Sequence, residues 1–336
     1  MVKKIILALI IAIVSVHAGW YAASRVLQSR TAPDRKIAVA TRNRNMEKFD
    51  IHIDEKSLEE TDIDANGVRL HLSVFALGRN APTLVFIPGT SVYAQIYIDF
   101  MYRMYRQGFN VVGFDPRGHG LSGGRRGDYT IDELVADTRA VVNYARQRFG
   151  GRPAIAGSSQ GGMVAFYTAA RDDSISAAVC HNLADLNGKD NLVLSTLRIP
   201  PALSPIVWRI MSVYESYMIP ISLYLDLKKE HLPDGSDAAA MIGQDPLCVT
   251  WISVRAMRSL LRTGLAKPVE KIRVPIMLIH SDRDNIFPRR YVEGIYRRLS
   301  CPKNYLLLKE RDHLVMTNNA GEVVPPVSAW LKKIMR

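Results

Sequence analysis

Gly157-Ser158-Ser159-Gln160-Gly161 is the stretch of sequence that decides the fold of this chain. It follows the apolar run 153–156, which is typical of a buried strand, and it precedes the helix-like run 162–167. A G-x-S-x-G sequence between a strand and a helix is the context of a nucleophile elbow, in which a tight turn lifts a serine out of the sheet. The glycines suit this turn because its strained backbone leaves no room for side chains beside it. The spacing predicts Ser159, and not Ser158, as the nucleophile.

Two later residues strengthen this prediction, because a G-x-S-x-G sequence also occurs at ordinary strand-to-helix turns. Asp284 and His313 each come shortly after an apolar run that is typical of a strand. In open α/β sheets, functional sites lie at the carboxyl ends of the strands. The order Ser159, Asp284, His313 is also the order of nucleophile, acid and base in one known type of catalytic triad. The sequence therefore predicts a serine hydrolase site built from these three residues.

Each of the two partners has a competing interpretation. His280 also lies at a strand end, but it precedes the acid in the sequence. Asp282 is close to Asp284, although an apolar pair between Asp284 and Pro288 favours the latter. A structural role is the alternative for His313.

Residues 115–122, with the sequence DPRGHGLS, resemble the D-x-R-G-H-G-x-S segment of the monoacylglycerol lipase and lysophospholipase group of the α/β-hydrolase superfamily. The resemblance runs from about Leu70 to the C-terminus and is weakest between residues 186 and 267. It implies that Ser159 is the nucleophile, Asp284 the acid and His313 the base. It also implies a mainly parallel sheet that is covered by helices on both faces and carries a helical cap insertion. The alternation of strand-like and helix-like segments along the chain favours the same α/β-hydrolase fold.

The resemblance further implies an oxyanion hole formed by the backbone N–H groups of Thr90 and Gln160. Pro88 stands where this group usually has the histidine of an H-G pair. Proline has no N–H, so residue 88 cannot donate, but Gly89 and Thr90 can. Acyl transfer by such a site needs no metal and no organic cofactor.

The chain divides into four parts by its sequence pattern. Residues 25–60 are charged and mixed, which indicates a linker with a short strand near residues 49–53. Residues 186–267 have several prolines and no clear strands, and the resemblance implies that the cap is inserted there. The predicted parts are an N-terminal leader or anchor at 1–24, the linker at 25–60, a hydrolase core at 61–185 and 268–336, and a helical cap at 186–267.

The N-terminus carries the localisation signal. Lys3 and Lys4 precede the apolar run 5–14, and small residues before Gly19 offer a cleavage site, as in a secretory signal peptide. If the apolar stretch instead continues to Ala23, it is just long enough for a membrane anchor. Both alternatives predict an exported enzyme, either membrane-anchored or free in an extracytoplasmic compartment such as the periplasm.

Composition sets the remaining limits. The 336 residues are 48% hydrophobic, which is enough for a large core. A formal net charge of +12 is compatible with attraction to an anionic membrane surface or with a merely solvated face. The arginines are scattered and no nucleic-acid motif is present, so we do not expect a nucleic-acid partner. The three cysteines have no C-x-x-C spacing and predict neither a disulfide framework nor a metal site.

The function that these observations favour is cleavage of carboxylic esters of acyl chains, such as monoacylglycerols or lysophospholipids, through an acyl-enzyme intermediate. The expected partner is a small-molecule or lipid ester, and nothing in the sequence indicates an oligomeric state. A peptidase or a thioesterase would use the same site, because the fold does not determine the substrate. A binding protein on a degenerate hydrolase scaffold would lack a triad member or have a broken elbow, and neither is seen.

Overall fold

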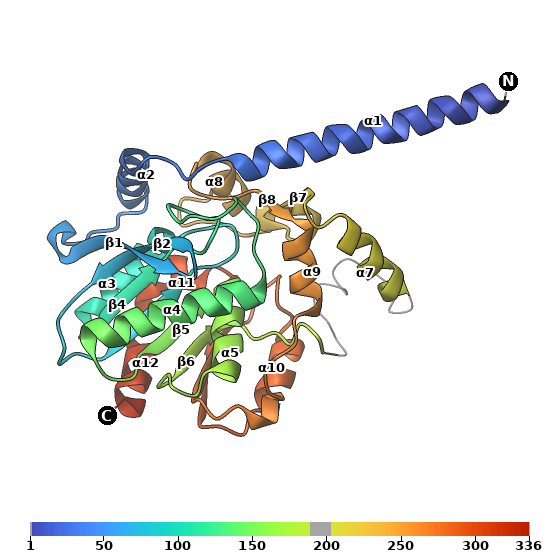
Figure 1. Cartoon of the computed structure of the whole chain (residues 1–336). Coiled ribbons are helices and arrows are strands. Elements are labelled where there is room, and N and C mark those ends of the chain that lie inside the picture. The colour runs from blue at the N-terminus through green and yellow to red at the C-terminus, as the bar shows by residue number, and fades with distance from the viewer. Residues whose placement is uncertain (1, 189–202, 336) are drawn as a thin grey trace.

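An eight-stranded sheet forms the centre of the molecule (Figure 1). The computed structural model describes residues 2–188 and 203–335. The strand order is β1-β2-β4-β3-β5-β6-β9-β10; β2 pairs antiparallel with β1 and β4, and the other pairs are parallel. The predicted, mainly parallel sheet is confirmed. Its strands are β1 Leu58–Ala65, β2 Val68–Phe75, β3 Thr83–Ile87, β4 Asn110–Phe114, β5 Ala154–Ser158, β6 Ala178–His181, β9 Ile276–Ser281 and β10 Lys303–Leu308.

Helices cover both faces of this sheet. The chain passes from β3 through α3 to β4 in one direction, and from β4 through α4 to β5 in the other. Right-handed connections therefore place α3 and α4 on opposite faces. Helix α5 packs with α4, and α12 packs with α3. The core helices are α3 Ile98–Arg106, α4 Ile131–Phe149, α5 Gln160–Arg171, α10 Arg289–Arg298, α11 Val315–Asn318 and α12 Ala320–Ile334.

Local sequence signals account for two of these elements. Thr130 caps α4 by accepting the N–H of Glu133 at 3.2 Å, and the helix ends at Gly150, which has a φ of 80°. Asn66 and Gly67, with φ of 57° and 81°, form the tight turn between β1 and β2. The turn thus joins β1 and β2 in the antiparallel register in which Ala65 lies opposite Val68.

The described part of the predicted cap follows β6 and precedes β9. It contains α7 Ser204–Val213, α8 Ala238–Gln244 and α9 Val254–Arg262, and it also contains two strands of three residues each, β7 Met218–Pro220 and β8 Trp251–Ser253. These strands pair antiparallel and were not predicted, because runs of three residues show no periodicity in a sequence. Residues 189–202 of the predicted cap lie outside the described residues. The described part of the chain also contains short 3-10 helices at Glu55–Ser57, Ala94–Tyr97, Ile221–Leu223, Leu227–Lys229 and Val269–Lys271.

Two helices precede the sheet. Helix α1, Val2–Ser29, extends well beyond the rest of the molecule (Figure 1). Its C-terminal half contacts the cap: the indole N–H of Trp20 donates to the carbonyl of Met218 at 2.9 Å, and the hydroxyl of Ser24 accepts the N–H of Met218 at 2.9 Å. Among the described residues, no helix combines the length and the apolar character that crossing a membrane requires.

The segment expected to be a linker contains a second helix, α2, Arg35–Lys48. Asp34 caps this helix by accepting the N–H of Lys36 at 2.7 Å, and Ala38 and Thr41 are buried against the body. The predicted strand near residues 49–53 is wrong, because none of these residues belongs to a strand and β1 begins only at Leu58. A charged helix with few apolar positions gives too weak a pattern to be recognised.

Candidate active site

The elbow between β5 and α5 holds Ser159 in a strained conformation. Its φ is 54° and its ψ is −118°, a region that non-glycine residues adopt only when the surrounding structure enforces it. A Cβ on Gly157 would lie 2.1 Å from the carbonyl oxygen of Gly161, and one on Gly161 would lie 2.2 Å from that of Ile87. The glycines of the motif are therefore required by close backbone contacts, as the sequence predicted.

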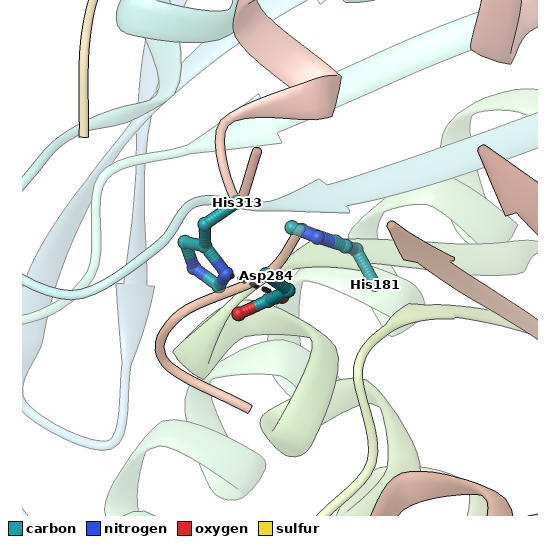
Figure 2. A group of neighbouring side chains, drawn as sticks. All are labelled: His181, Asp284 and His313. Carbon is teal, nitrogen blue, oxygen red and sulfur yellow. Dashed lines mark hydrogen bonds and ion pairs between the residues drawn. The ribbon is translucent and has the colours of Figure 1, made fainter. Parts of the chain in front are cut away.

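The three predicted triad residues lie together. The His313 Nε2 and Ser159 Oγ atoms are 2.9 Å apart. On the other edge of the ring, His313 Nδ1 is 2.8 Å from Asp284 Oδ2, and Figure 2 shows this contact. The other carboxylate oxygen of Asp284 accepts the N–H groups of Ile286 and Phe287, both at 2.8 Å. Asp284 and His313 follow β9 and β10, so both come from the carboxyl edge of the sheet, as does Ser159 after β5. This geometry allows proton transfer from the serine to the histidine.

The electrostatics keep Asp284 ionised. Burial of Asp284 opposes its ionisation, but the interactions with His313, with His181 and with the backbone N–H of Phe287 together outweigh this effect, so the pKa of Asp284 lies well below its usual value. The ring of Phe287 stacks on that of His313 at 5.7 Å between centroids. His313 is thus held by a carboxylate at one edge and by an aromatic ring on one face.

Two residues that the sequence analysis missed support both ends of the triad. His181 Nδ1 accepts the backbone N–H of Ser159 at 3.3 Å and faces the hydroxyl of Ser158 at 3.2 Å. The next residue, Asn182, donates from Nδ2 to Asp284 Oδ2 at 2.9 Å. His181 is fully buried, and this burial lowers its pKa, so it stays neutral as an acceptor must. The last residue of β6 and the residue after it therefore connect the nucleophile to the acid.

The two rivals of the triad lie elsewhere. His280 is behind Asp284, 3.8 Å from its carboxylate, and its Nδ1 is 2.6 Å from Oδ1 of Asn182. Asp282 is exposed. Neither occupies the position of acid or base beside Ser159.

One group of donor atoms also has the arrangement of a metal site. Single ligand atoms of His181, Asp284 and His313 lie within 4.8 Å of one another (Figure 2). Hydrogen bonds already account for this proximity, because Asp284 Oδ2 is bonded to His313 and His181 Nδ1 accepts the N–H of Ser159. The hydrogen-bond pattern is that of a triad with a supporting histidine.

The predicted oxyanion donors lie on either side of Ser159. Within the described part of the chain, the backbone N–H groups of Thr90 and Gln160 donate to no other residue, so both can face a ligand. The N–H of Gly89, the other candidate in this loop, donates to the hydroxyl of Tyr97 at 3.3 Å. Gln160 also begins α5, where the helix dipole favours negative charge.

The cap contributes one carboxyl group to the site. Glu230 is fully buried, and its Oε2 accepts the backbone N–H of His313 at 3.1 Å. Burial raises the pKa of Glu230. The neighbouring carbonyl of His231 accepts a hydrogen bond from Asn318 at 2.7 Å. Polar contacts therefore join the cap to the loop that carries His313. No local sequence pattern predicted these contacts.

The DPRGHGLS segment has a structural role beside the site. Buried Asp115 accepts the N–H groups of Ala94 at 3.0 Å and Leu121 at 2.8 Å. Arg117 forms a bidentate pair with Asp137 of α4 at 2.6 and 2.7 Å. These contacts hold the loops around the oxyanion donors.

Two cavities meet at Ser159. The larger has a volume of about 660 Å³ and reaches from Ser159 and His313 toward α2 and α3. The smaller has a volume of about 290 Å³, lies under the cap and includes both Thr90 and Gln160. Apolar side chains dominate the walls of the smaller one: Met163, Ala184, Leu186, Tyr224, Leu225, Leu260, Ile286 and Phe287.

The sequence of this chain is similar to those of known proteins. A bifunctional esterase/perhydrolase from Acinetobacter calcoaceticus is 24% identical over 221 residues, which cover 62% of this chain and 77% of that protein. A putative non-heme haloperoxidase from Mycobacterium phage D29 is 34% identical over 121 residues, covering 36% of this chain and only 41% of the phage protein.

Solved structures share the fold. The monoacylglycerol lipase of Paleococcus ferrophilus matches 79% of this chain and 98% of its own with a TM-score of 0.64 at 21% identity. A soluble variant of the monoglyceride lipase of Saccharomyces cerevisiae matches 82% and 96% with a TM-score of 0.64 at 19% identity. The model of the family described as serine aminopeptidase, S33, matches residues 78–319. The chain therefore belongs to this family within the α/β-hydrolase superfamily.

Proposed function

We propose that this protein is a serine hydrolase that cleaves carboxylic esters of acyl chains through an acyl-enzyme intermediate. The observation that carries the proposal is the pair of contacts at 2.9 Å and 2.8 Å that joins Ser159, His313 and Asp284 where two cavities meet. A serine hydroxyl needs such a base to become a nucleophile near neutral pH.

In the proposed mechanism, His313 Nε2 takes the proton of Ser159 as the serine oxygen attacks the ester carbonyl. Asp284 holds the ring in the tautomer that leaves Nε2 free to accept, and it stabilises the imidazolium. The N–H groups of Thr90 and Gln160 bind the oxyanion, where each donor is worth about 10²–10³ in rate. His313 then protonates the leaving alcohol, and the same residues activate a water molecule that hydrolyses the acyl-enzyme.

The smaller cavity supports an acyl ester as the substrate. Its walls are mostly apolar, and it borders both proposed oxyanion donors, so the carbonyl and its acyl chain fit there together. Esters of medium acyl chains, including monoacylglycerols and lysophospholipids, have this combination of an apolar tail and a polar alcohol.

The test is hydrolysis of p-nitrophenyl esters from acetate to palmitate by the full chain and by Ser159→Ala. We expect an optimum at a medium chain length and a loss of at least about 10³-fold in kcat in the variant. Ser57→Ala is the matched control, because the Ser57 hydroxyl is bonded only to the carbonyl of Asp54, remote from the site. Full activity in Ser159→Ala would refute the assignment.

A peptidase is the second candidate, and the description of the matched family favours it. The same assay with amino-acid p-nitroanilides, and with an acyl thioester for the thioesterase alternative, separates these reactions. If the anilides were cleaved much faster than every ester, the acyl-ester proposal would fall while the role of Ser159 would stand.

A further inference from the structure

The larger cavity carries three arginines that the proposed reaction does not use. Arg42 of α2 and Arg103 and Arg106 of α3 line the same cavity as Ser159 and His313. We call it the arginine cavity. The smaller cavity that meets it at Ser159 has one lysine and one aspartate in its walls but no arginine. Both cavities are lined largely by apolar side chains, so the two sides of the nucleophile differ in charge and not in polarity.

Arg42 is the most informative of the three because it is buried. Its side chain is 7% exposed, yet the nearest carboxylate oxygens, those of Glu55 and Glu60, are both 3.9 Å away. Glu60 is already engaged by the amide of Gln95 at 2.6 Å. Arg42 Nε donates a long hydrogen bond of 3.4 Å to Oδ1 of Asn43. A buried cation is stable only when it is paired and hydrogen-bonded, so this one has donors to spare for a ligand.

Arginines outnumber aspartates among the charged side chains that line the arginine cavity. Asp50 and Asp99 also line the arginine cavity. Asp99 is neutralised by Arg103, whose Nε lies 2.8 Å from both of its carboxylate oxygens. Arg106, about one turn further along α3, lines the cavity and is exposed. Among the residues that line the cavity, this leaves Arg42 and Arg106 with one acidic side chain, Asp50, while Glu55 and Glu60 lie 3.9 Å from Arg42 outside the lining.

Helix α2 holds this wall in place and is an addition to the family core. Lys48 at its end pairs with Asp234 of the cap at 2.7 Å, and Ala38 is buried against the body. The family match begins only at residue 78, so Arg42 lies outside it. A specificity feature of this chain would be expected in such an added element, because the shared core carries the chemistry.

We propose that the alcohol part of the substrate occupies the arginine cavity and carries an anionic group, a phosphate or a carboxylate, that Arg42 and Arg106 bind. This inference rests on the proposed esterase function. Guanidinium groups bind both anions through paired, charge-assisted hydrogen bonds, which are about twice as strong as neutral ones. The acyl chain then lies in the smaller, apolar cavity, and the scissile carbonyl lies between the two at Ser159.

The test compares esters that share one acyl chain and differ only in the alcohol. The full chain is assayed below the micellar range with 1-decanoylglycerol, 1-decanoylglycerol 3-phosphate and the decanoyl ester of glycerate, and with p-nitrophenyl decanoate as the reference. We expect kcat/KM for at least one anionic ester to exceed that for 1-decanoylglycerol by about tenfold or more. The phosphate and glycerate arms identify which anion the site prefers.

Variants assign the effect to the arginines. Arg42→Gln should lower kcat/KM for the preferred anionic ester by about 10- to 100-fold and change that for p-nitrophenyl decanoate by less than about threefold. Arg106→Gln, at an exposed position, should act in the same direction and does not depend on a buried substitution being tolerated. Arg44→Gln is the matched control, since Arg44 is exposed on the same helix and does not line the cavity.

The outcomes distinguish the proposal of an anionic alcohol group from the proposed esterase function. Equal cleavage of neutral and anionic esters, or an equal loss on all four substrates in both arginine variants, would overturn the anionic-alcohol proposal and leave the esterase function intact. Failure of the wild-type protein to cleave p-nitrophenyl decanoate or any other ester would overturn the proposed function itself.

Discussion

His181 provides the sharpest test of how the site is built. Its Nδ1 is the acceptor for the backbone N–H of Ser159 and lies beside the hydroxyl of Ser158. Replacing His181 by leucine leaves both donors without this acceptor in a buried environment, and one unsatisfied buried donor costs about 1–3 kcal/mol. Ser159 has a φ of 54°, so its position depends on such contacts.

If about 1–2 kcal/mol of this cost is needed to keep Ser159 in its reactive position, the activation free energy rises by that amount, and kcat decreases by about 5- to 30-fold in His181→Leu. KM should change far less, because His181 lines neither cavity. His181→Gln is the matched variant: its amide oxygen can accept the same N–H, so we expect a kcat within about threefold of the wild type.

The assay is the kinetics of p-nitrophenyl decanoate hydrolysis together with the melting temperature of each variant. A purely structural role would lower the melting temperature of both variants and leave kcat unchanged. A wild-type kcat in His181→Leu, or an equal loss in the leucine and glutamine variants, would refute the reasoning.

Two further predictions concern stability. Burial lowers the pKa of His119 to about 4, so the unfolded chain binds a proton at this residue more tightly than the folded chain does. The contribution of neutral His119 to the stability of the fold is therefore complete above the unfolded pKa near 6.5, and it is lost as the pH falls to about 4. The free energy of unfolding in urea should therefore differ between pH 7.5 and pH 4.5 by about 2.5 kcal/mol less in His119→Phe than in the wild type, and identical pH dependences would contradict this prediction. Gly161→Ala should abolish soluble expression or activity, since the added Cβ would lie 2.2 Å from the carbonyl oxygen of Ile87. Gly243→Ala, where a Cβ meets no atom within 4 Å, should express normally, and equal behaviour of the two variants would refute this account of the elbow.

The parts of the site that could be predicted from the sequence are those encoded over a few residues. The elbow is one, because Gly157 and Gly161 are required by backbone contacts close to Ser159. The capped start of α4 at Thr130 is another. The order of Asp284 and His313 after apolar runs was informative because parallel strands end at one edge of the sheet.

The supporting residues could not be predicted in the same way. His181 and Asn182 reach the triad only because β6 pairs beside β5 and β9, a neighbourhood that arises from the whole topology. An apolar run ends at Cys180, directly before this pair. Because functional residues follow the carboxyl ends of strands in open α/β sheets, this position is the one local signal for His181 and Asn182. Glu230 comes from the cap and meets His313 across 83 residues of sequence. Its role depends on tertiary packing alone.

The N-terminal region shows that charge composition alone does not predict whether a segment is a linker or a helix. The charges of residues 25–60 indicated a linker, but Asp34 caps the helix α2 within this segment, and Arg42 of that helix lines the larger cavity. A charged segment can be a solvated linker or a helix that buries one narrow face, and the sequence pattern is too weak to distinguish them.

The central claim is that Ser159 is the activated nucleophile, and covalent labelling tests it most directly. The full chain and Ser159→Ala would be treated with a fluorophosphonate and analysed by peptide mass spectrometry. The account predicts a single adduct, on the peptide that contains Ser159, and no adduct in the variant. Labelling of another residue in the wild type, or equal labelling of the variant, would contradict it.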